Sequence, residues 1–375
     1  MPVGQRGAGC GNQVLPDAEP GASGRGTRCC RLWQRRVGGR EQLPARRRWM
    51  GTTPHPPALK EGMTHTAKTI GSLSVSPLSL GGNVFGWTAD EAESFRVLDA
   101  YVAGGGNFID TADAYSVWVP GNKGGESETV IGNWLAARGN RDEVVIATKV
   151  GAHPDLKGLS AATIKTAVDA SLTRLRTDYI DLYYTHYDDE SVEVAEFLTA
   201  LDELVRAGKV REIGASNISA QRLDASLTFS AREGLARYVA IQPHYNLVSR
   251  DTYEGELADV AARHGVAAVP YYALASGFLT GKYRPGGSVD SARSGKAAEY
   301  LETERGRRVL QALDTVAATH GAELATVALA WLAAQPTVAA PIASARNVAQ
   351  LPPLLAVADL TLTDVELALL REASA

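Results

Sequence analysis

Four residues of the kinds that manage protons each lie at or just after the end of a short apolar segment. They are Asp110 and Tyr115 in NFIDTADAY (107–115), Lys149 at the end of VVIATK (144–149), and His186 at the end of IDLYYTH (180–186). In a parallel β/α barrel, the active site is built from the carboxyl ends of several strands. We therefore expect these four side chains to meet in one site.

A carboxylate, a phenol, an amine and an imidazole together can handle one proton at a carbonyl oxygen. A free tyrosine is a poor acid near neutrality, and we expect the Lys149 ammonium to lower the pKa of the Tyr115 phenol. A charged lysine in an apolar strand needs a carboxylate, which Asp110 can supply. His186 would hydrogen-bond the carbonyl oxygen and orient it.

Each of these residues also has a purely structural interpretation. Asp110 could cap the following turn, Tyr115 could be a loop aromatic, and His186 could be a satisfied histidine at a strand end. Lys149 is harder to explain in this way, because a buried lysine without a partner is costly. The arrival of all four at consecutive strand ends favours the catalytic interpretation.

The elements that must position these residues alternate between strand and helix patterns. A small hairpin is predicted over 68–76. Strands are predicted at 78–82, 107–112, 144–149, 180–185, 211–215, 239–243, 267–272 and 338–343. Helices are predicted at 90–103, 126–137, 160–175, 193–207, 219–233, 253–264, 323–334 and 347–356, with extra helices near 305–319 and 363–372. Eight strand–helix units predict an α/β fold of the TIM type, a (β/α)8 barrel.

A doubly wound sheet is the main alternative fold. It requires a glycine-rich phosphate turn between its first strand and first helix. The glycine-rich stretch at 7–11 lies far before the first strand, and the one at 104–106 leads into a strand. The barrel is therefore favoured. The long, glycine-containing connection at 274–304 is expected to fold over a bound cofactor.

Composition excludes several classes of function. Of the 375 residues, 45% are hydrophobic and 21% charged, which is typical of a soluble globular protein. No apolar run approaches the length needed to cross a bilayer. The formal net charge of −4 gives no reason to expect nucleic acid or an anionic membrane as partner. No cluster has metal-ligand spacing, so no metal is expected.

Residues 1–62 differ from the rest of the chain. They carry 11 Lys and Arg against 4 Asp and Glu, so this segment is +7 and residues 63–375 are −11. We predict a disordered, basic, Gly/Arg/Pro-rich extension followed by a single barrel domain over 63–375. An organelle transit peptide and a basic arm for a polyanion are alternatives to an extension without a role, which is favoured because Met63 directly precedes the ordered pattern. All three cysteines lie in the extension, which indicates a reducing, cytoplasmic location for the body.

From about residue 68 to 372, the chain resembles an aldo-keto reductase. NFIDTADAY, TK and DLYYTH resemble the catalytic tetrad of that family, in family order, and place it on Asp110, Tyr115, Lys149 and His186. The resemblance implies a nicotinamide dinucleotide held in extended form on the barrel mouth, and a small carbonyl compound as substrate.

The resemblance also carries binding residues onto this chain. They are Ser216, Asn217 and Gln242 for the nicotinamide carboxamide; Tyr271 for stacking on the nicotinamide; Ser276, Gly277, Leu279 and Lys282 for the pyrophosphate; and Ser344, Arg346 and Gln350 for the adenosine end. Arg346 would hold a 2′-phosphate, which favours NADPH over NADH. Trp87 and Trp118 would line the substrate pocket, with ordinary packing at its rim as the alternative. His153 lies at the barrel mouth and could touch the substrate, but a loop histidine without that role is favoured. The chain departs from the common family pattern at Tyr272, Ala273 and Leu354, which bears on cofactor affinity.

The resulting prediction is an NADPH-dependent oxidoreductase that reduces an aldehyde or ketone, with Tyr115 as the general acid. One alternative is a reductase of keto or unsaturated nucleotide-sugars in secondary metabolism. Another is a cofactor-sensing regulatory subunit resembling potassium-channel β subunits. The substrate and the oligomeric state are left open by the sequence.

Overall fold

The computed structural model describes residues 67–284 and 294–375. The predictions made for residues 1–62, and for part of the 274–304 connection, lie outside these described residues.

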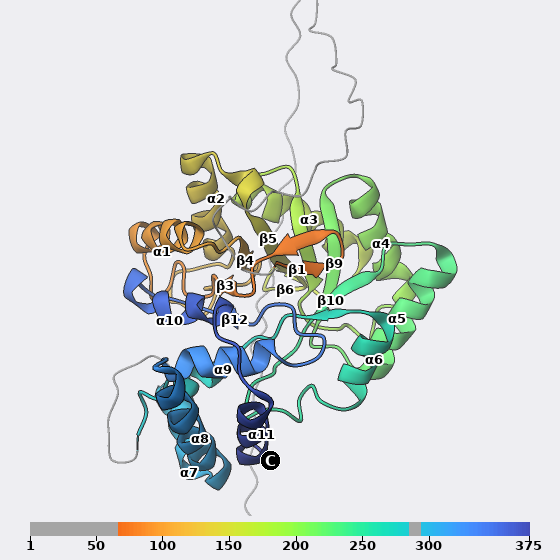
Figure 1. Cartoon of the computed structure of the whole chain (residues 1–375). Helices are drawn as coiled ribbons and strands as arrows, with labels where there is room; N and C mark the ends of the chain where they lie inside the picture. The colour runs from red at the N-terminus through yellow and green to blue at the C-terminus, as the bar shows by residue number, and fades with distance from the viewer. Residues whose placement is uncertain (1–66, 285–293) are drawn as a thin grey trace, which may run out of the picture. The chain divides into compact units, whose positions relative to one another are not determined.

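Eight parallel strands form the central sheet (Figure 1). In spatial order they are β12 (Ile342–Ala343), β3 (Ser79–Gly81), β4 (Phe108–Asp110), β5 (Val145–Val150), β8 (Ile180–Thr185), β9 (Val210–Ser216), β10 (Tyr238–Gln242) and β11 (Ala267–Ala268). The two ends of this order meet, because Ala268 forms a parallel bridge with Val338. The Ala339 amide also donates to the Ala268 carbonyl at 2.9 Å, and the Ile342 amide to the Pro270 carbonyl at 2.9 Å. The predicted (β/α)8 barrel is confirmed.

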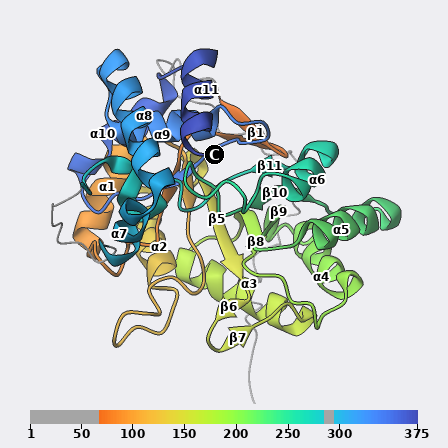
Figure 2. The ribbon, with the colours of Figure 1, turned by 90° about the horizontal axis from the view of Figure 1, so that it is seen from below.

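Helices cover the outside of the strands. Those that follow the strands are α1 (Glu91–Ala103), α2 (Glu126–Arg138), α3 (Ala161–Leu175), α4 (Val194–Arg206), α5 (Ala220–Glu233), α6 (Glu256–His264), α9 (Leu324–Ala333) and α10 (Pro352–Leu355). Figure 2 shows α3 to α6 in sequence along the outer side of β5, β8, β9 and β10. The extra helices are α7 (Ser294–Glu302), α8 (Glu304–His320) and α11 (Asp364–Ala373). Among the described helices none could cross a membrane singly, although the bent pair α8 and α9 passes by length and composition.

The N-terminal end of the barrel is closed by the predicted hairpin, β1 (Lys68–Ile70) and β2 (Leu73–Val75). Ile70, Leu73 and Val75 are buried in one cluster with Phe108 and Leu182 from the barrel interior. Burying these side chains at this end fills the barrel, so a site can open only at the opposite end.

Three sequence predictions about elements were wrong in extent. The strands predicted at 267–272 and 338–343 shrink to two residues each, because Pro270 and Pro341 have no N–H to give to a ladder. The helix predicted at 347–356 is broken into the 3₁₀ turn η3 (Val348–Gln350), the short α10 and the turn η4 (Ala356–Ala358). The 274–304 connection contains the 3₁₀ segment η2 (Ala275–Thr280) and α7. The small hairpin of β6 (Ala152–His153) and β7 (Leu156–Lys157) was not predicted.

Candidate active site

Lys149 is the centre of the cluster at the carboxyl ends of the strands. It is fully buried on β5, and its Nζ donates to both carboxylate oxygens of Asp110, at 2.9 and 2.8 Å. The same Nζ reaches the Thr111 carbonyl at 2.7 Å and the Tyr115 hydroxyl at 3.0 Å. Asp110 is the last residue of β4, and Tyr115 lies in the turn that follows. The ammonium is thus held between a carboxylate and the phenol.

The electrostatics of Tyr115 differ from the sequence prediction. Burial and the Asp110 carboxylate raise the pKa of the Tyr115 phenol well above its usual range, and outweigh the neighbouring ammonium. Burial also lowers the pKa of Lys149, while Asp110 opposes that change. The expected lowering of the Tyr115 pKa is therefore wrong for this site. The phenol keeps its proton at neutral pH, which a proton donor requires.

His186 follows β8 and lines the same site as a neutral imidazole. Burial, helped by the Lys149 charge, lowers the pKa of His186 to about 3. Its Nδ1 atom is buried and has no hydrogen-bond partner within the described part of the chain. The ring stacks on Tyr187 with centroids 4.9 Å apart and meets Tyr115 edge-on at 6.1 Å. A neutral imidazole has one N–H, which can be donated to a substrate oxygen.

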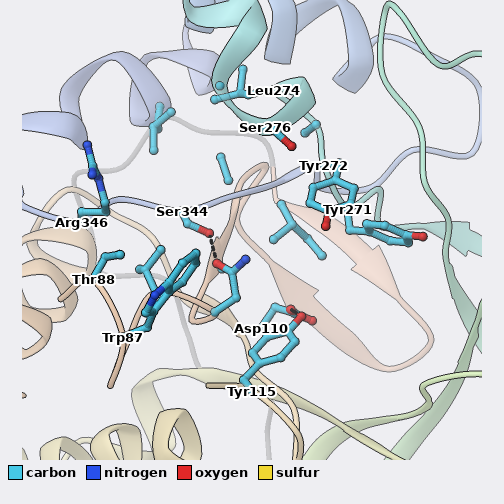
Figure 3. A pocket seen from close by; sticks show the side chains of 18 of the residues that line it. Trp87, Thr88, Asp110, Tyr115, Tyr271, Tyr272, Leu274, Ser276, Ser344 and Arg346 are labelled. Carbon is cyan, nitrogen blue, oxygen red and sulfur yellow. Dashed lines mark hydrogen bonds between the residues drawn. The ribbon is translucent and has the colours of Figure 1, made fainter. Parts of the chain in front are cut away.

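The site opens into a cavity of about 740 Å³. Fifteen of the residues singled out from the sequence line it: Trp87, Asp110, Tyr115, Trp118, His186, Ser216, Asn217, Gln242, Tyr271, Ser276, Gly277, Lys282, Ser344, Arg346 and Gln350. Figure 3 shows Asp110 and Tyr115 at one end and Arg346 and Ser276 towards the other. Lys149 lies behind Tyr115, and the Leu279 side chain is buried in the core away from the cavity.

Three amide and hydroxyl side chains lie beside the tetrad, at the ends of β9 and β10. Gln242 donates to the Asp110 carboxylate at 2.8 Å, and Ser216 donates to the Gln242 carbonyl at 2.8 Å. Asn217 donates to the His186 carbonyl at 2.8 Å and accepts from the Tyr271 hydroxyl at 2.8 Å. These bonds fix amide groups next to the proton-handling residues, where a carboxamide could be bound.

The far end of the cavity is cationic. The Arg346 guanidinium has no carboxylate partner among the described residues, and its backbone N–H is held by Gln350 at 2.9 Å. Lys282 lies 5.0 Å from the Tyr283 ring and likewise forms no ion pair within 67–284 or 294–375. Cationic side chains without carboxylate partners along a groove can bind phosphate groups. An amide set at one end and cations at the other fit an extended dinucleotide.

The remaining wall of the cavity is aromatic. Trp87 and Trp118 meet edge-on at 5.6 Å, and Trp118 lies 6.2 Å from the Tyr115 ring. His153 does not line the cavity; it is buried in the β6–β7 hairpin, where its Nδ1 accepts the Asp155 amide at 3.2 Å. The two tryptophans and Tyr115 bound the space in which a carbonyl substrate would lie.

Several lining residues were not predicted from the sequence, among them Asn83, Thr88, Tyr187 and Glu323. Asn83 accepts from the Ser344 hydroxyl at 2.7 Å, and its place in LGGN, directly after the first strand, was a usable signal. Glu323 had no such signal, because only tertiary packing brings the start of α9 to the cavity. In the described segments no group of three His, Cys, Asp or Glu side chains could hold a metal ion.

A (β/α)8 barrel with this lysine, tyrosine, histidine and aspartate around a long groove defines an oxidoreductase site. A family model described as "Aldo/keto reductase family" matches residues 77–375. The chain belongs to the aldo/keto reductase family, whose members typically use nicotinamide cofactors.

Known relatives support the same assignment. Protein tas of Escherichia coli (strain K12) is 36% identical over 308 residues, covering 75% of this chain and 88% of its own length. Norsolorinic acid reductase B of Aspergillus parasiticus is 34% identical over 314 residues, covering 79% of this chain and 80% of its own length. The uncharacterized oxidoreductase YrpG of Bacillus subtilis is 36% identical over 288 residues, covering 74% and 86%. Two of these names, norsolorinic acid reductase B and oxidoreductase YrpG, agree with an oxidoreductase.

Proposed function

We propose that this protein reduces an aldehyde or ketone to the alcohol with NADPH as the reductant. The observation that carries the proposal is the Lys149 ammonium, fully buried between the Asp110 carboxylate and the Tyr115 hydroxyl, with Asp110 and Tyr115 both lining the cavity. When bound, the nicotinamide cofactor supplies the hydride that reduces the carbonyl carbon.

Tyr115 supplies the proton. As negative charge develops on the carbonyl oxygen, that oxygen becomes the conjugate base of an alcohol, which is a weaker acid than a phenol. Transfer of the phenol proton is therefore favourable even though the pKa of Tyr115 is raised. Lys149, 3.0 Å from the phenol oxygen, stabilises the negative charge left there.

The other residues orient the substrate carbonyl and hold the catalytic side chains in place. The neutral His186 donates its one N–H to the carbonyl oxygen, which places that oxygen near Tyr115. Gln242 and Lys149 keep the Asp110 carboxylate fixed. Trp87 and Trp118, which meet edge-on, form an aromatic wall beside the reacting atoms.

The choice of NADPH rests on Arg346. A guanidinium without a carboxylate partner at the far end of the groove suits a 2′-phosphate, which NADH lacks. The reductase names of relatives such as norsolorinic acid reductase B support a small organic carbonyl as substrate. We assign the activity to a reducing compartment, because residues 63–375 contain no cysteine.

Removing the hydroxyl of Tyr115, the proposed proton donor, tests this function. Tyr115→Phe should slow NADPH-dependent reduction of a panel of aldehydes, ketones and quinones by about 10²–10⁴-fold, without weakening NADPH binding. Tyr187→Phe is the matched control, since it removes a hydroxyl from the ring stacked on His186 but not from the proton path. A Tyr115→Phe enzyme with an unchanged rate would disprove the proposal. Tight NADPH binding with no turnover on any carbonyl would favour a cofactor-sensing role.

A further inference from the structure

A second polar cluster lies on the outer side of β5, behind the catalytic residues. Side chains alternate along a strand, so Lys149 faces the barrel interior and Thr148 faces the helices outside. We call this the outer cluster; its members are Asp113, Glu128, Thr148, Arg174 and Tyr183. Glu128 comes from α2 and Arg174 from α3, the two helices that pack against each other beside β4 and β5 (Figure 1).

In the outer cluster, hydrogen bonds satisfy the carboxylate of Glu128 but not that of Asp113. Glu128 accepts the Thr148 hydroxyl at 2.5 Å and the Arg174 Nε at 2.6 Å, so both of its carboxylate oxygens are satisfied. Apart from a weak contact with the Gly151 backbone N–H, neither carboxylate oxygen of Asp113 has a hydrogen-bond partner among the described residues, although this side chain is only 1% exposed. The buried Tyr183 hydroxyl is unpartnered as well. Two buried carboxyl groups thus lie near one guanidinium, that of Arg174, and this guanidinium is bonded to Glu128. The other carboxyl, Asp113, has no cation of its own, which favours its protonated form.

Asp113 is tied directly to the catalytic residues. It lies in the turn between Asp110 and Tyr115, and its backbone N–H donates to the Lys149 carbonyl at 3.3 Å. The Thr111 amide donates to the Ala147 carbonyl at 2.8 Å, and the Thr111 carbonyl accepts from the Lys149 ammonium at 2.7 Å. A charge on Asp113 would therefore act on Lys149 across a single strand.

Four charged or titratable groups act on the Asp113 side chain: Glu128 from α2, Arg174 from α3, Lys149 from β5 and Tyr183 from β8. The His153 ring of β6 lies near the Asp113 backbone carbonyl, next to Gly124. Burial, reinforced by Glu128, raises the pKa of Asp113 to about 7, against the opposing effects of Arg174, the Gly151 amide and Lys149. The group therefore titrates where the enzyme would work.

We propose that Asp113 is a positioning residue that controls the proton donor through its own protonation. While Asp113 is neutral, the Lys149 ammonium is free to stabilise charge on Tyr115. Once Asp113 loses its proton, the new negative charge behind β5 holds the ammonium and makes the Tyr115 proton harder to release. Reduction should therefore slow as pH rises through the titration of Asp113. This inference rests on the proposed function.

The first experiment is a pH profile of kcat for NADPH-dependent reduction of 4-nitrobenzaldehyde. The wild-type rate should fall about three- to tenfold through the neutral range. Asp113→Asn, which cannot ionise, should lose this fall. Glu128→Gln should move the fall to lower pH, because it removes a neighbouring carboxylate and frees Arg174 to pair with Asp113. Asp142→Asn, an exposed carboxylate distant from the cavity, should leave the profile unchanged. An Asp113→Asn profile with the wild-type fall would overturn the proposal.

The second measurement does not depend on turnover. In wild-type protein with ¹³C-labelled aspartate, one carboxyl resonance should titrate near neutrality, and Glu128→Gln should shift that titration to lower pH. If every aspartate titrates only in the acidic range, Asp113 is not the switch. If no carbonyl is reduced by any variant while this resonance behaves as expected, the proposed function has failed and the ionisation of Asp113 stands.

Discussion

At the scale of single residues, the buried ammonium of Lys149 determines both the stability and the chemistry of the site. Its three N–H groups are shared among the Asp110 carboxylate, the Thr111 carbonyl and the Tyr115 hydroxyl. A buried ion pair adds little net stability compared with an apolar pair of the same shape, but removing one partner leaves an uncompensated charge. The pair is therefore explained by the need for a cation next to the proton donor.

This view predicts the outcome of a pair of substitutions. Lys149→Met should lower the free energy of unfolding by about 3–5 kcal/mol, because Asp110 is left charged and buried. The double variant Lys149→Met with Asp110→Asn should recover most of that loss, since a neutral amide can still accept the Gln242 bond now made at 2.8 Å. Urea unfolding measures both, and neither variant should reduce carbonyls. Equal stability of the single and double variants would contradict the argument.

At the scale of elements, the approach of α2 to α3 fixes the outer cluster. Gly132 lies within α2, and a Cβ atom there would come within 2.1 Å of the Arg174 carbonyl and 2.8 Å of the Leu175 backbone. The two helices can pack this closely only because position 132 has no side chain. Glu128 and Arg174, one on each helix, meet as a consequence.

Gly132→Ala should therefore destabilise the protein, although alanine is the better helix former. The clash with backbone atoms should cost about 1–3 kcal/mol, which outweighs the roughly 1 kcal/mol gained in helix propensity. Gly295→Ala on α7 is the matched control, because a Cβ there meets nothing within 4 Å. Thermal unfolding should show a lower Tm for Gly132→Ala and no loss for Gly295→Ala. A gain in Tm at position 132 would show that the helices can separate freely.

The same elements show what the sequence could predict. The strand at 180–185 was predicted to the residue, because its apolar run is bounded by polar residues and packs on both faces. The last two strands were predicted too long, because the bonds that close the barrel come from isolated bridges around Pro270 and Pro341. Helix α7 was missed, since its sequence is polar and its short pattern resembles a loop.

Part of the candidate site could be predicted from the sequence, and part of it could not. Asp110, Tyr115 and Lys149 could be placed together because each lies at or just after the carboxyl end of a strand, and these ends face the same side of the barrel. The raised pKa of Tyr115 could not be predicted, because it depends on how far the folded chain buries the phenol and on the nearby Asp110 carboxylate. The outer cluster could not be predicted from the sequence either, since Glu128 and Arg174 are 46 positions apart and meet only through helix packing.

At the scale of the whole molecule, the groove draws on elements from most of the barrel. Its lining includes Ser216 at the end of β9, Gln242 at the end of β10, and Ser344 after β12, the strand that closes the barrel against β3. A ligand that contacts all of them binds only the folded chain. Such a ligand stabilises the fold according to its concentration relative to Kd, by about 2.7 kcal/mol at a hundredfold excess over Kd.

Because a bound cofactor stabilises the fold, the preference for NADPH or NADH can be measured as a difference in Tm. At equal concentrations NADPH should raise Tm more than NADH, because only NADPH carries the 2′-phosphate that Arg346 would bind. Arg346→Gln should reduce the NADPH shift to the NADH level and leave the NADH shift unchanged. Arg284→Gln is the control on a nearby loop, since that guanidinium is already paired with Asp314 at 2.6 Å. It should lower Tm slightly and preserve the difference between the cofactors. Equal shifts with NADPH and NADH in the wild-type protein would show that Arg346 does not select the cofactor.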